Sequence, residues 1–201
     1  MGPVVHAHAL RYIVQMPLRV ALLRSMVVNR HRVSGTDVRA LAKAAGGTHA
    51  RSVMATGNAI FHSRKSATTL THDLEAACKA RFGQPTEIIV KTEEEWRALV
   101  AANPFKAAAK KTPNRVLVWI MREPVPVSGI AQLRRRAHAS ETITRLRSGD
   151  FYIHLGMPNR DDTKLAAGFG LNHIGAVGTN RTWTTVAAIT KALDEMEAGK
   201  E

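Results

Sequence analysis

Apolar and polar positions change period repeatedly along the chain, and the changes predict a run of short strands and helices. Residues 18–28 are almost continuously apolar and β-prone, which is typical of a central strand buried on both faces. Apolar residues at helical spacing then predict a helix that ends at the Gly46-Gly47 pair. The other elements expected in this half are strands at 51–55 and 59–63 around a Thr56-Gly57-Asn58 turn, a helix from Ser66 to Gly83, and a strand at 86–91.

The second half repeats this order. Between the halves, Thr92 and Glu95 have the spacing of a capping box, which predicts a connecting helix at residues 92–102. The elements expected after it are a buried strand at 115–121, a helix from Ser128, strands at 143–147 and 151–155, a short helix at 163–169, an extended piece near Val177, and a last helix capped by Thr184 or Thr185.

The order β-α-β-β-α-β is that of the split βαβ, or ferredoxin-like, unit. We therefore expect an α+β protein made of two tandem ferredoxin-like (βαββαβ) halves with antiparallel sheets. The expected divisions are a flexible N-terminal extension at residues 1–16, a first half at 17–91, a connecting helix and linker at 92–112, and a second half at 113–198.

Charge adds a functional hypothesis. The chain has 29 Lys and Arg against 16 Asp and Glu, a formal net charge of +13, and residues 1–91 hold 13 basic but 4 acidic side chains. Such an excess attracts polyanions without specific contacts, although arginines scattered over a surface need not share a purpose. Aromatic residues make up 5% of the chain, so any nucleic-acid binding should be electrostatic and non-specific. Neutralising Arg24, Arg30 and Arg32 should then weaken binding more than neutralising Arg134 and Arg135.

The cysteine count bears on location. Cys78 is the one cysteine, so an intrachain disulfide or a thiolate metal cluster cannot form. Its place on an apolar helical stripe predicts a buried, inert thiol, and a reducing compartment fits, so we expect a cytoplasmic protein. No apolar run approaches the roughly 18 residues of a membrane span, and residues 1–15 do not form a convincing signal peptide. No membrane partner is therefore expected.

Several segments, taken in order, carry a family resemblance. They are VALLRSMVVNRHRV (20–33), RSVMATGNAIF (51–61), VAANPF (100–105), YIHL…TKL (152–165) and TNRTWTTV (179–186). In this order and spacing they resemble domain-of-unknown-function family 1697 (DUF1697), a widespread bacterial family of small α+β proteins. The resemblance extends from about Leu18 to Leu193. It implies the tandem ferredoxin-like fold, but it implies no established activity and assigns no catalytic residues.

The chain departs from the family at several uncharged polar positions. The family usually follows the arginine of the first strand with Gly-Ile-Asn-Val-Gly-Gly, whereas Arg24 is followed here by Ser-Met-Val-Val-Asn-Arg. Val27 thus replaces an asparagine, and Asn29-Arg30 replaces a pair of glycines. Ala55 stands where a glutamine usually precedes the turn, and Thr182 where the family has the asparagine of Arg-Asn-Trp. These departures mark a divergent member, in which an ancestral activity could have been lost.

Four polar residues are candidates for an anion-binding pocket: Arg24, Asn58, Lys164 and Arg181. A strand-end arginine, a turn with exposed backbone N–H groups and a lysine at a helix N-terminus are groups that bind anions. The competing interpretation is structural, with Asn58 holding a turn, Arg24 and Arg181 paired with carboxylates, and Lys164 in solvent.

Two ring residues complete the candidate set. His154 is expected in a strand, on the same face as Tyr152, and could act as a general base near neutral pH or be a satisfied structural histidine. Trp183 could stack on a nucleic-acid base or serve as a packing anchor just before the last helix.

The sequence contains no Walker loop, HExxH, paired cysteines or GxSxG. It predicts no metal and no cofactor, and it leaves open whether any reaction is catalysed. The leading hypothesis is a non-enzymatic basic binding protein for a phosphate-rich partner such as nucleic acid. The alternatives are a small-molecule-binding protein or enzyme with its site in the groove between the halves, and a divergent member that has lost the ancestral activity.

Overall fold

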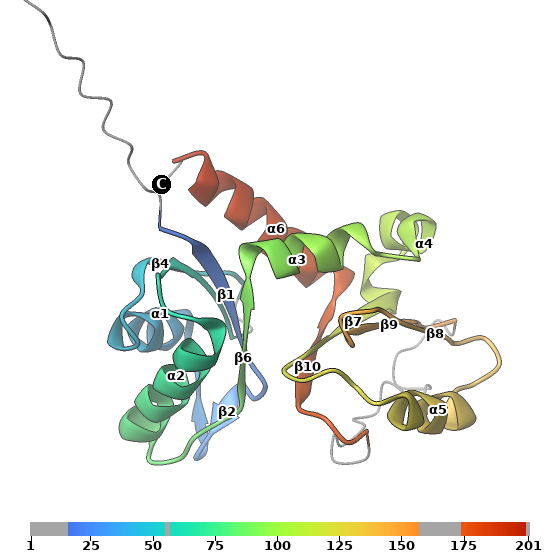
Figure 1. Ribbon diagram of the computed structural model, residues 1–201, viewed down its shortest axis with the longest axis horizontal. Helices are drawn as coiled ribbons and strands as arrows, with labels where there is room; N and C mark the ends of the chain where they lie inside the picture. The colour runs from blue at the N-terminus through green and yellow to red at the C-terminus, as the bar shows by residue number, and fades with distance from the viewer. Residues whose placement is uncertain (1–15, 55–56, 157–173, 200–201) are drawn as a thin grey trace, which may run out of the picture.

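The first half forms a four-stranded sheet with two helices on one face (Figure 1). The computed structural model describes residues 16–54, 57–156 and 174–199. The strand order is β4-β5-β1-β6, and every pairing is antiparallel. The strands are β1 (Leu18–Leu23), β4 (Thr48–Ser52), β5 (Asn58–His62) and β6 (Ile88–Thr92), and the covering helices are α1 (Gly35–Ala44) and α2 (Ala67–Phe82).

The second half forms a similar sheet. Its strand order is β10-β7-β9-β8, again with antiparallel pairing throughout, and helix α5 packs on its outer face (Figure 1). Both sheets thus share one order, in which the first strand of the half lies between its third and fourth strands. The elements are β7 (Val116–Met121), α5 (Val127–Arg136), β8 (Thr142–Arg145), β9 (Phe151–His154) and β10 (Gly178–Thr182).

Two helices run across the junction of the sheets: α3 (Glu93–Ala101) and α6 (Trp183–Glu197) (Figure 1). The predicted capping box at the start of α3 is confirmed, because the Thr92 hydroxyl accepts from the Glu95 N–H at 3.1 Å and the Glu95 carboxylate accepts from the Thr92 N–H at 2.8 Å. Trp96 is fully buried, and its indole N–H donates to Thr190 Oγ1 at 3.1 Å.

The buried side chains between the sheets form what we call the central cluster. It joins residues of β1, β5 and β6 to residues of β7, β9, α3 and α6, and it includes Leu22, Ile60, Ile89, Trp96, Val118, Tyr152 and Ile189. Two further clusters lie on the outer faces, one under α1 and α2 and one under α5. The molecule is therefore a mixed α/β protein with antiparallel sheets, and the part described has six α-helices. The prediction of antiparallel sheets is confirmed.

The expected first strand is divided. β1 ends at Leu23, and β2 (Val27–Val28) pairs with β3 (His31–Arg32) in a separate hairpin. Ser25 separates β1 from β2, because its hydroxyl donates to the Val27 carbonyl at 2.6 Å and also lies 3.2 Å from the Val27 N–H. The hairpin turns at Asn29 and Arg30, both with positive φ. The prediction of one strand over residues 18–28 followed by a loop was wrong, since apolar content alone did not reveal this turn.

Smaller differences concern element boundaries. β4 begins three residues before the expected strand and contains a register shift between Thr48 and Arg51, with His49 at φ 51°. α5 begins at Val127 after Pro126, without a side-chain cap, and α6 begins at Trp183, ahead of the expected caps. Helix α4 (Lys106–Lys111) and the 3₁₀ turn η1 (Pro113–Arg115) were not predicted. The helix expected at residues 163–169 lies outside the described residues.

Cys78 is fully buried on the inner face of α2, as its place on the apolar stripe predicted. Burial raises the pKa of its thiol. At neutral pH the side chain is therefore a protonated thiol, which is a poor nucleophile.

Candidate functional site

The predicted site residues Asn58 and Arg181 are in direct contact where the two halves meet. Arg181 lies in β10, and its Nε donates to Asn58 Oδ1 at 2.7 Å. The other guanidinium nitrogens donate at 2.8 Å to Thr179 Oγ1, to the Asn180 carbonyl and to the Leu23 carbonyl. These four acceptors, all in the described part of the chain, are uncharged oxygen atoms: an amide oxygen, a hydroxyl oxygen and two carbonyl oxygens.

This contact is buried. Arg181 is 9% exposed and Asn58 is fully buried. Burial lowers the pKa of Arg181 to about 10, so its guanidinium remains charged at neutral pH. Asn58 also donates to the Val53 carbonyl at 3.0 Å, which fixes its amide with the oxygen toward Arg181. Because protein oxygens occupy the donors of Arg181, this arrangement fits a structural connection between the halves better than an open anion pocket.

Arg24 lies one residue after Leu23 at the end of the same strand, but it has a different partner. Its guanidinium donates to Glu87 Oε1 at 2.8 Å, and its N–H donates to the Glu87 carbonyl at 2.9 Å. The two side chains are 25% and 45% exposed. The structural interpretation, pairing with a carboxylate, therefore describes Arg24 correctly. For Arg181, the described contacts are with an amide, a hydroxyl and carbonyls instead.

The remaining candidates lie elsewhere. His154 is half-buried, and its ring centroid lies 5.5 Å from that of Phe105. Trp183 packs against the central cluster, with its ring 6.3 Å from that of Tyr152. Lys164 lies outside the described residues. Among those described, no hydrogen bond, ion pair or ring contact joins His154 or Trp183 to the contact between Asn58 and Arg181.

The face of β9 that carries Tyr152 and His154 is not a free polar face. Tyr152 is fully buried, and its hydroxyl donates to the Leu99 carbonyl of α3 at 2.8 Å. The expected strand alternation is correct, because Phe151 and Ile153 point to the outer cluster instead. No pattern in the sequence indicated that α3 would cover the Tyr152 face.

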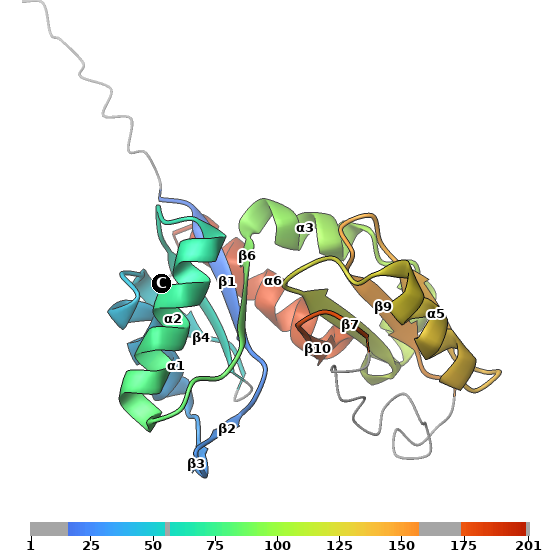
Figure 2. The same ribbon diagram turned by 60° about the horizontal axis from the view of Figure 1, so that its bottom comes forward.

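A second group of polar residues surrounds the β2–β3 hairpin, which Figure 2 shows at the lower end of the first half. The hairpin docks on the C-terminal end of α2, where Asn29 Nδ2 donates to the Phe82 carbonyl at 2.8 Å. The His31 ring stacks on the Phe82 ring with centroids 4.9 Å apart. The last turn of α2 contributes Lys79 and Arg81 to this end of the molecule.

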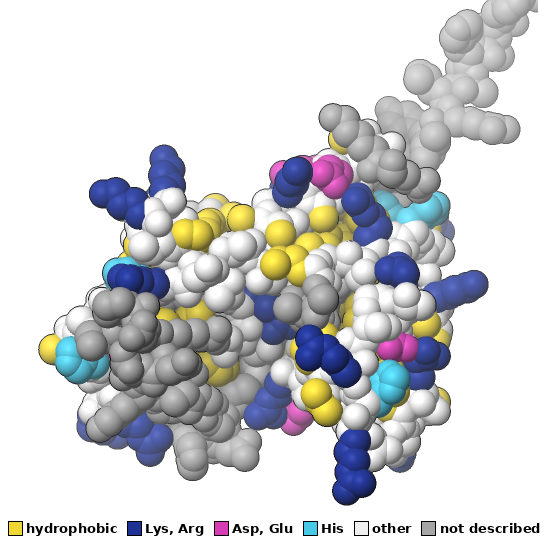
Figure 3. Space-filling view, turned by 180° about the vertical axis from the view of Figure 1, so that it is seen from behind, with side chains coloured by type: hydrophobic (Ala, Val, Ile, Leu, Met, Phe, Trp, Pro, Cys, Tyr) yellow, Lys and Arg dark blue, Asp and Glu magenta, His cyan; other side chains and the backbone are white. Residues whose placement is uncertain are grey.

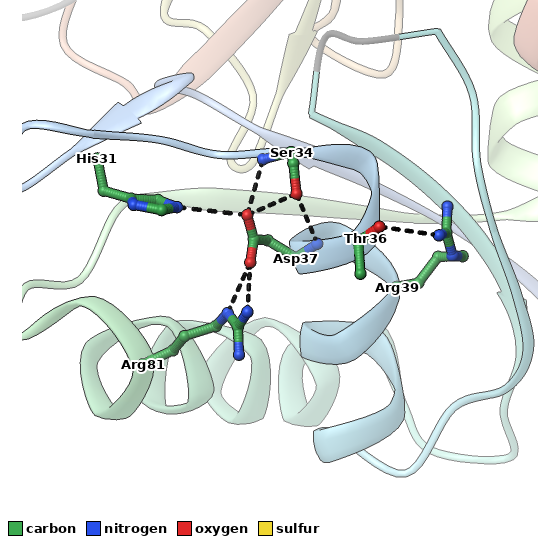
Figure 4. Close-up of polar contacts among 6 residues, drawn as sticks. All are labelled: His31, Ser34, Thr36, Asp37, Arg39 and Arg81. Atoms are coloured by element: carbon green, nitrogen blue, oxygen red, sulfur yellow. Dashed lines mark hydrogen bonds and ion pairs between the residues drawn. The ribbon is translucent and has the colours of Figure 1, made fainter.

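Asp37 organises the contact between hairpin and helices (Figure 4). Its Oδ2 accepts from the Ser34 hydroxyl at 2.7 Å and from the Ser34 N–H at 2.9 Å. Its Oδ1 accepts from Arg81 Nε at 2.9 Å, and His31 Nε2 lies 3.4 Å from Oδ2. The carboxylate thus ties α1, α2 and the hairpin together.

The environment of Asp37 keeps it ionised. Burial by itself raises the pKa of its carboxyl. The hydrogen bonds from Ser34, Arg81 and His31 lower that pKa more strongly, so that it lies well below its usual range. Asp37 therefore holds a negative charge throughout the neutral and mildly acidic range.

The group contains a serine, a histidine and an aspartate, but it is not arranged as a catalytic triad. In a triad the serine hydroxyl donates to the histidine, and the aspartate holds the other ring nitrogen. Here the Ser34 hydroxyl donates directly to Asp37, and among the described residues no hydrogen bond joins Ser34 to His31. The imidazole is therefore not placed to take the hydroxyl proton.

We call the exposed cations at this end the hairpin patch: Arg30, Arg32, Lys79 and Arg81. The nearby carboxylates of α2 are engaged elsewhere, since Asp73 pairs with Lys65 at 2.7 Å and Glu75 pairs with Arg122. On the face shown in Figure 3, the Lys and Arg side chains are spread out and are not gathered in one patch. The sequence indicated Arg30 and Arg32, but it did not indicate that α2 would add two cations beside them.

The structure also has an open depression of about 840 Å³ between the start of β1, the first turns of α3 and the end of α6. Of its lining cations, Arg97 is held by Glu93 and Asp194, each at 2.8 Å, and by Glu197 at 3.0 Å. Arg19 also lines the depression, and its guanidinium donates to the Lys65 carbonyl at 3.2 Å.

Among the residues described, no group of three or more His, Cys, Asp or Glu side chains could hold a metal ion. None of the described helices is both long enough and apolar enough to cross a membrane.

These features define a class: a mixed α/β protein with two antiparallel sheets, a shared core and a locally basic surface. The chain belongs to the family described as "Protein of unknown function (DUF1697)", whose model matches residues 16–152. The resemblance seen in the sequence is thereby confirmed.

A solved structure supports the fold. The chain is similar to the conserved bacterial protein SP0830 from Streptococcus pneumoniae, with a TM-score of 0.69 and 17% sequence identity over 89% of this chain and 99% of that chain. At this identity the likeness shows the fold alone. No curated protein matches the chain.

Proposed function

We propose that the protein is a non-catalytic binding protein for phosphate-rich polymers, with nucleic acid as its partner, and that the hairpin patch is its contact surface. The observation that supports this proposal is that the hairpin with the exposed Arg30 and Arg32 docks on the end of α2, whose last turn carries the exposed Lys79 and Arg81. The buried carboxylate of Asp37 pairs with one of these four cations, Arg81. Cations in this arrangement can each replace a counterion on a phosphate backbone.

Binding of this kind is non-specific. Base recognition requires side chains that reach base edges or aromatic rings on which bases stack. The aromatic residue of this region, Phe82, is 9% exposed and is covered by His31, so it offers no stacking platform. The cations spread over the face shown in Figure 3 add long-range attraction without selecting a sequence.

We also propose that each half is a ferredoxin-like βαββαβ unit. The support is the strand order, which is the same in both sheets and places the first strand between the third and the fourth. A cytoplasmic location belongs to the same proposal, because a buried, free Cys78 fits a reducing compartment.

Binding should be tested with random single- and double-stranded oligonucleotides at several salt concentrations. The test variant is Arg30→Gln/Arg32→Gln/Lys79→Gln, and the matched control is Arg134→Gln/Arg135→Gln/Arg136→Gln, which removes three exposed cations from α5. Arg24 is left out because its side chain is paired with Glu87. Each lost phosphate contact should flatten the slope of log K against log salt by about 0.7 to 0.9.

We expect the hairpin variant to lose most of the salt-dependent affinity and the α5 variant to lose less. Equal losses would show that the charge acts as a whole and that the hairpin patch is not the contact surface. Binding that is insensitive to salt, or selective for one sequence, would contradict the electrostatic account. An absence of binding at low and moderate salt would remove nucleic acid as the partner.

A further inference from the structure

His31 occupies the middle of the hairpin patch, between Arg30 and Arg32. Its side chain is 54% exposed, and its Nε2 lies 3.4 Å from Asp37 Oδ2 (Figure 4). Stacking on Phe82 holds the ring against the end of α2. The histidine is therefore fixed in place and still open to solvent and to a ligand.

The charged groups around His31 come from three elements. Helix α1 contributes Asp37, whose carboxylate lies 3.4 Å from Nε2. Helix α2 contributes Arg81, and the hairpin itself contributes Arg30 and Arg32. Arg81 is bonded to the same carboxylate, so part of its charge is compensated there.

We propose that protonation of His31 strengthens the binding of nucleic acid at the hairpin patch, so that affinity rises as the pH falls below neutrality. This inference rests on the proposed function. A histidine changes charge between about pH 5 and 8. Four cations and the Asp37 carboxylate give the patch a net charge of +3, which protonation of His31 raises to +4.

The geometry gives the imidazolium a ligand-facing role as well as a charge. Its Nε2 is directed at Asp37, so Nδ1 is the second donor of the protonated ring. Among the described residues, no hydrogen bond is formed by Nδ1. A phosphate oxygen can therefore accept from it without breaking a contact within the protein.

The experiment compares the wild type with His31→Gln, His31→Lys and His72→Gln, using a labelled random-sequence duplex at pH 5.5 and pH 8.0. His72→Gln is the matched control, because His72 also lies near a carboxylate, 3.6 Å from Asp73, and its side chain is 86% exposed. In about 0.1 M salt the wild type should bind roughly fivefold more tightly at pH 5.5, with a salt slope steeper by about 0.7 to 0.9.

His31→Gln should remove this difference, and His72→Gln should retain it. His31→Lys carries its charge at both pH values, so at pH 8.0 it should bind as the wild type does at pH 5.5. The inference is overturned if the wild type binds equally at both pH values, or if His31→Gln keeps the full pH dependence. Failure of the wild type to bind at either pH overturns the proposed function instead, which separates the two results.

Discussion

Arg181 shows how a charged side chain can be placed inside this protein. Transferring a guanidinium from water to the interior is costly unless its donors are matched. Asn58 Oδ1, Thr179 Oγ1 and two carbonyls accept from it at 2.7 to 2.8 Å. The side chain reaches from β10 into the first half, so it also fixes how the halves meet.

Replacing Arg181 with leucine should destabilise the protein strongly. The substitution removes the guanidinium that donates to the buried Asn58 Oδ1 and to the Leu23 carbonyl, which should lower the free energy of unfolding by about 3 kcal/mol or more. Arg24→Leu is the control, since its partly exposed pair with Glu87 should contribute about 1 kcal/mol or less. Urea denaturation followed by circular dichroism measures both. Similar losses in the two variants would contradict the structural role of Arg181.

The sequence placed Arg181 and Asn58 in the same candidate site, but it could not give the nature of their contact. They are 123 residues apart, and their proximity depends on how the two sheets pack against each other. Residue type suggested an anion pocket for both. The structure instead shows that the asparagine itself, with the carbonyls, supplies the oxygens that the arginine binds.

The β2–β3 hairpin is the element whose geometry departs most from its sequence pattern. Asn29 has φ 47° and Arg30 has φ 64°, so both residues of the turn are left-handed. Two consecutive residues with positive φ form the kind of turn that joins the strands of a tight hairpin, a turn in which glycine is common. A side chain with a Cβ is disfavoured in this conformation, less so for asparagine than for arginine. The apolar content therefore predicted a longer strand, because the turn contains no glycine that would have indicated its position.

Arg30→Gly should have opposite effects on stability and on nucleic-acid binding. Relief of the left-handed conformation should raise the free energy of unfolding by about 0.5 to 1 kcal/mol, because glycine adopts positive φ readily. The loss of one cation should flatten the salt slope of nucleic-acid binding by about 0.7 to 0.9. Thermal or urea denaturation and the oligonucleotide titration measure the two effects.

The control for this prediction is Arg32→Gly, which removes the same charge from β3, where φ is not positive. It should weaken binding similarly but lower stability, since glycine in a strand is unfavourable. A loss of stability in Arg30→Gly as large as that in Arg32→Gly would refute the strain at the turn.

At the scale of the whole molecule, the halves are separate in sequence but share a core. The central cluster takes side chains from both sheets and from α3 and α6. Polar contacts join the halves as well: Lys91 lies 3.2 Å from Asp150, and Arg51 lies 3.2 Å from Glu195. The repeated order of elements was readable from periodicity. The burial of Trp96 between the sheets was not, because local patterns do not say which helix face meets which sheet.

The shared core predicts a single cooperative unfolding transition. Trp96 lies in the central cluster and Trp183 packs against it, whereas Trp119 of β7 lies in the outer cluster under α5, so their fluorescence reports on the middle of the molecule and on the second half. Circular dichroism reports on helices throughout the chain. The two signals should give the same midpoint in urea. Two separated transitions would show instead that the halves unfold independently.

Helices α3 and α6 occupy corresponding places in the two halves. Each helix follows the last strand of its own half, and the two make contact with each other at the junction of the sheets. Matching surfaces that meet in this way are the hallmark of an isologous dimer, in which two identical subunits bury the same face against each other. Within this one polypeptide, the corresponding helices of the two halves are likewise packed against each other. The basic β2–β3 hairpin of the first half has no counterpart among the described residues of the second half.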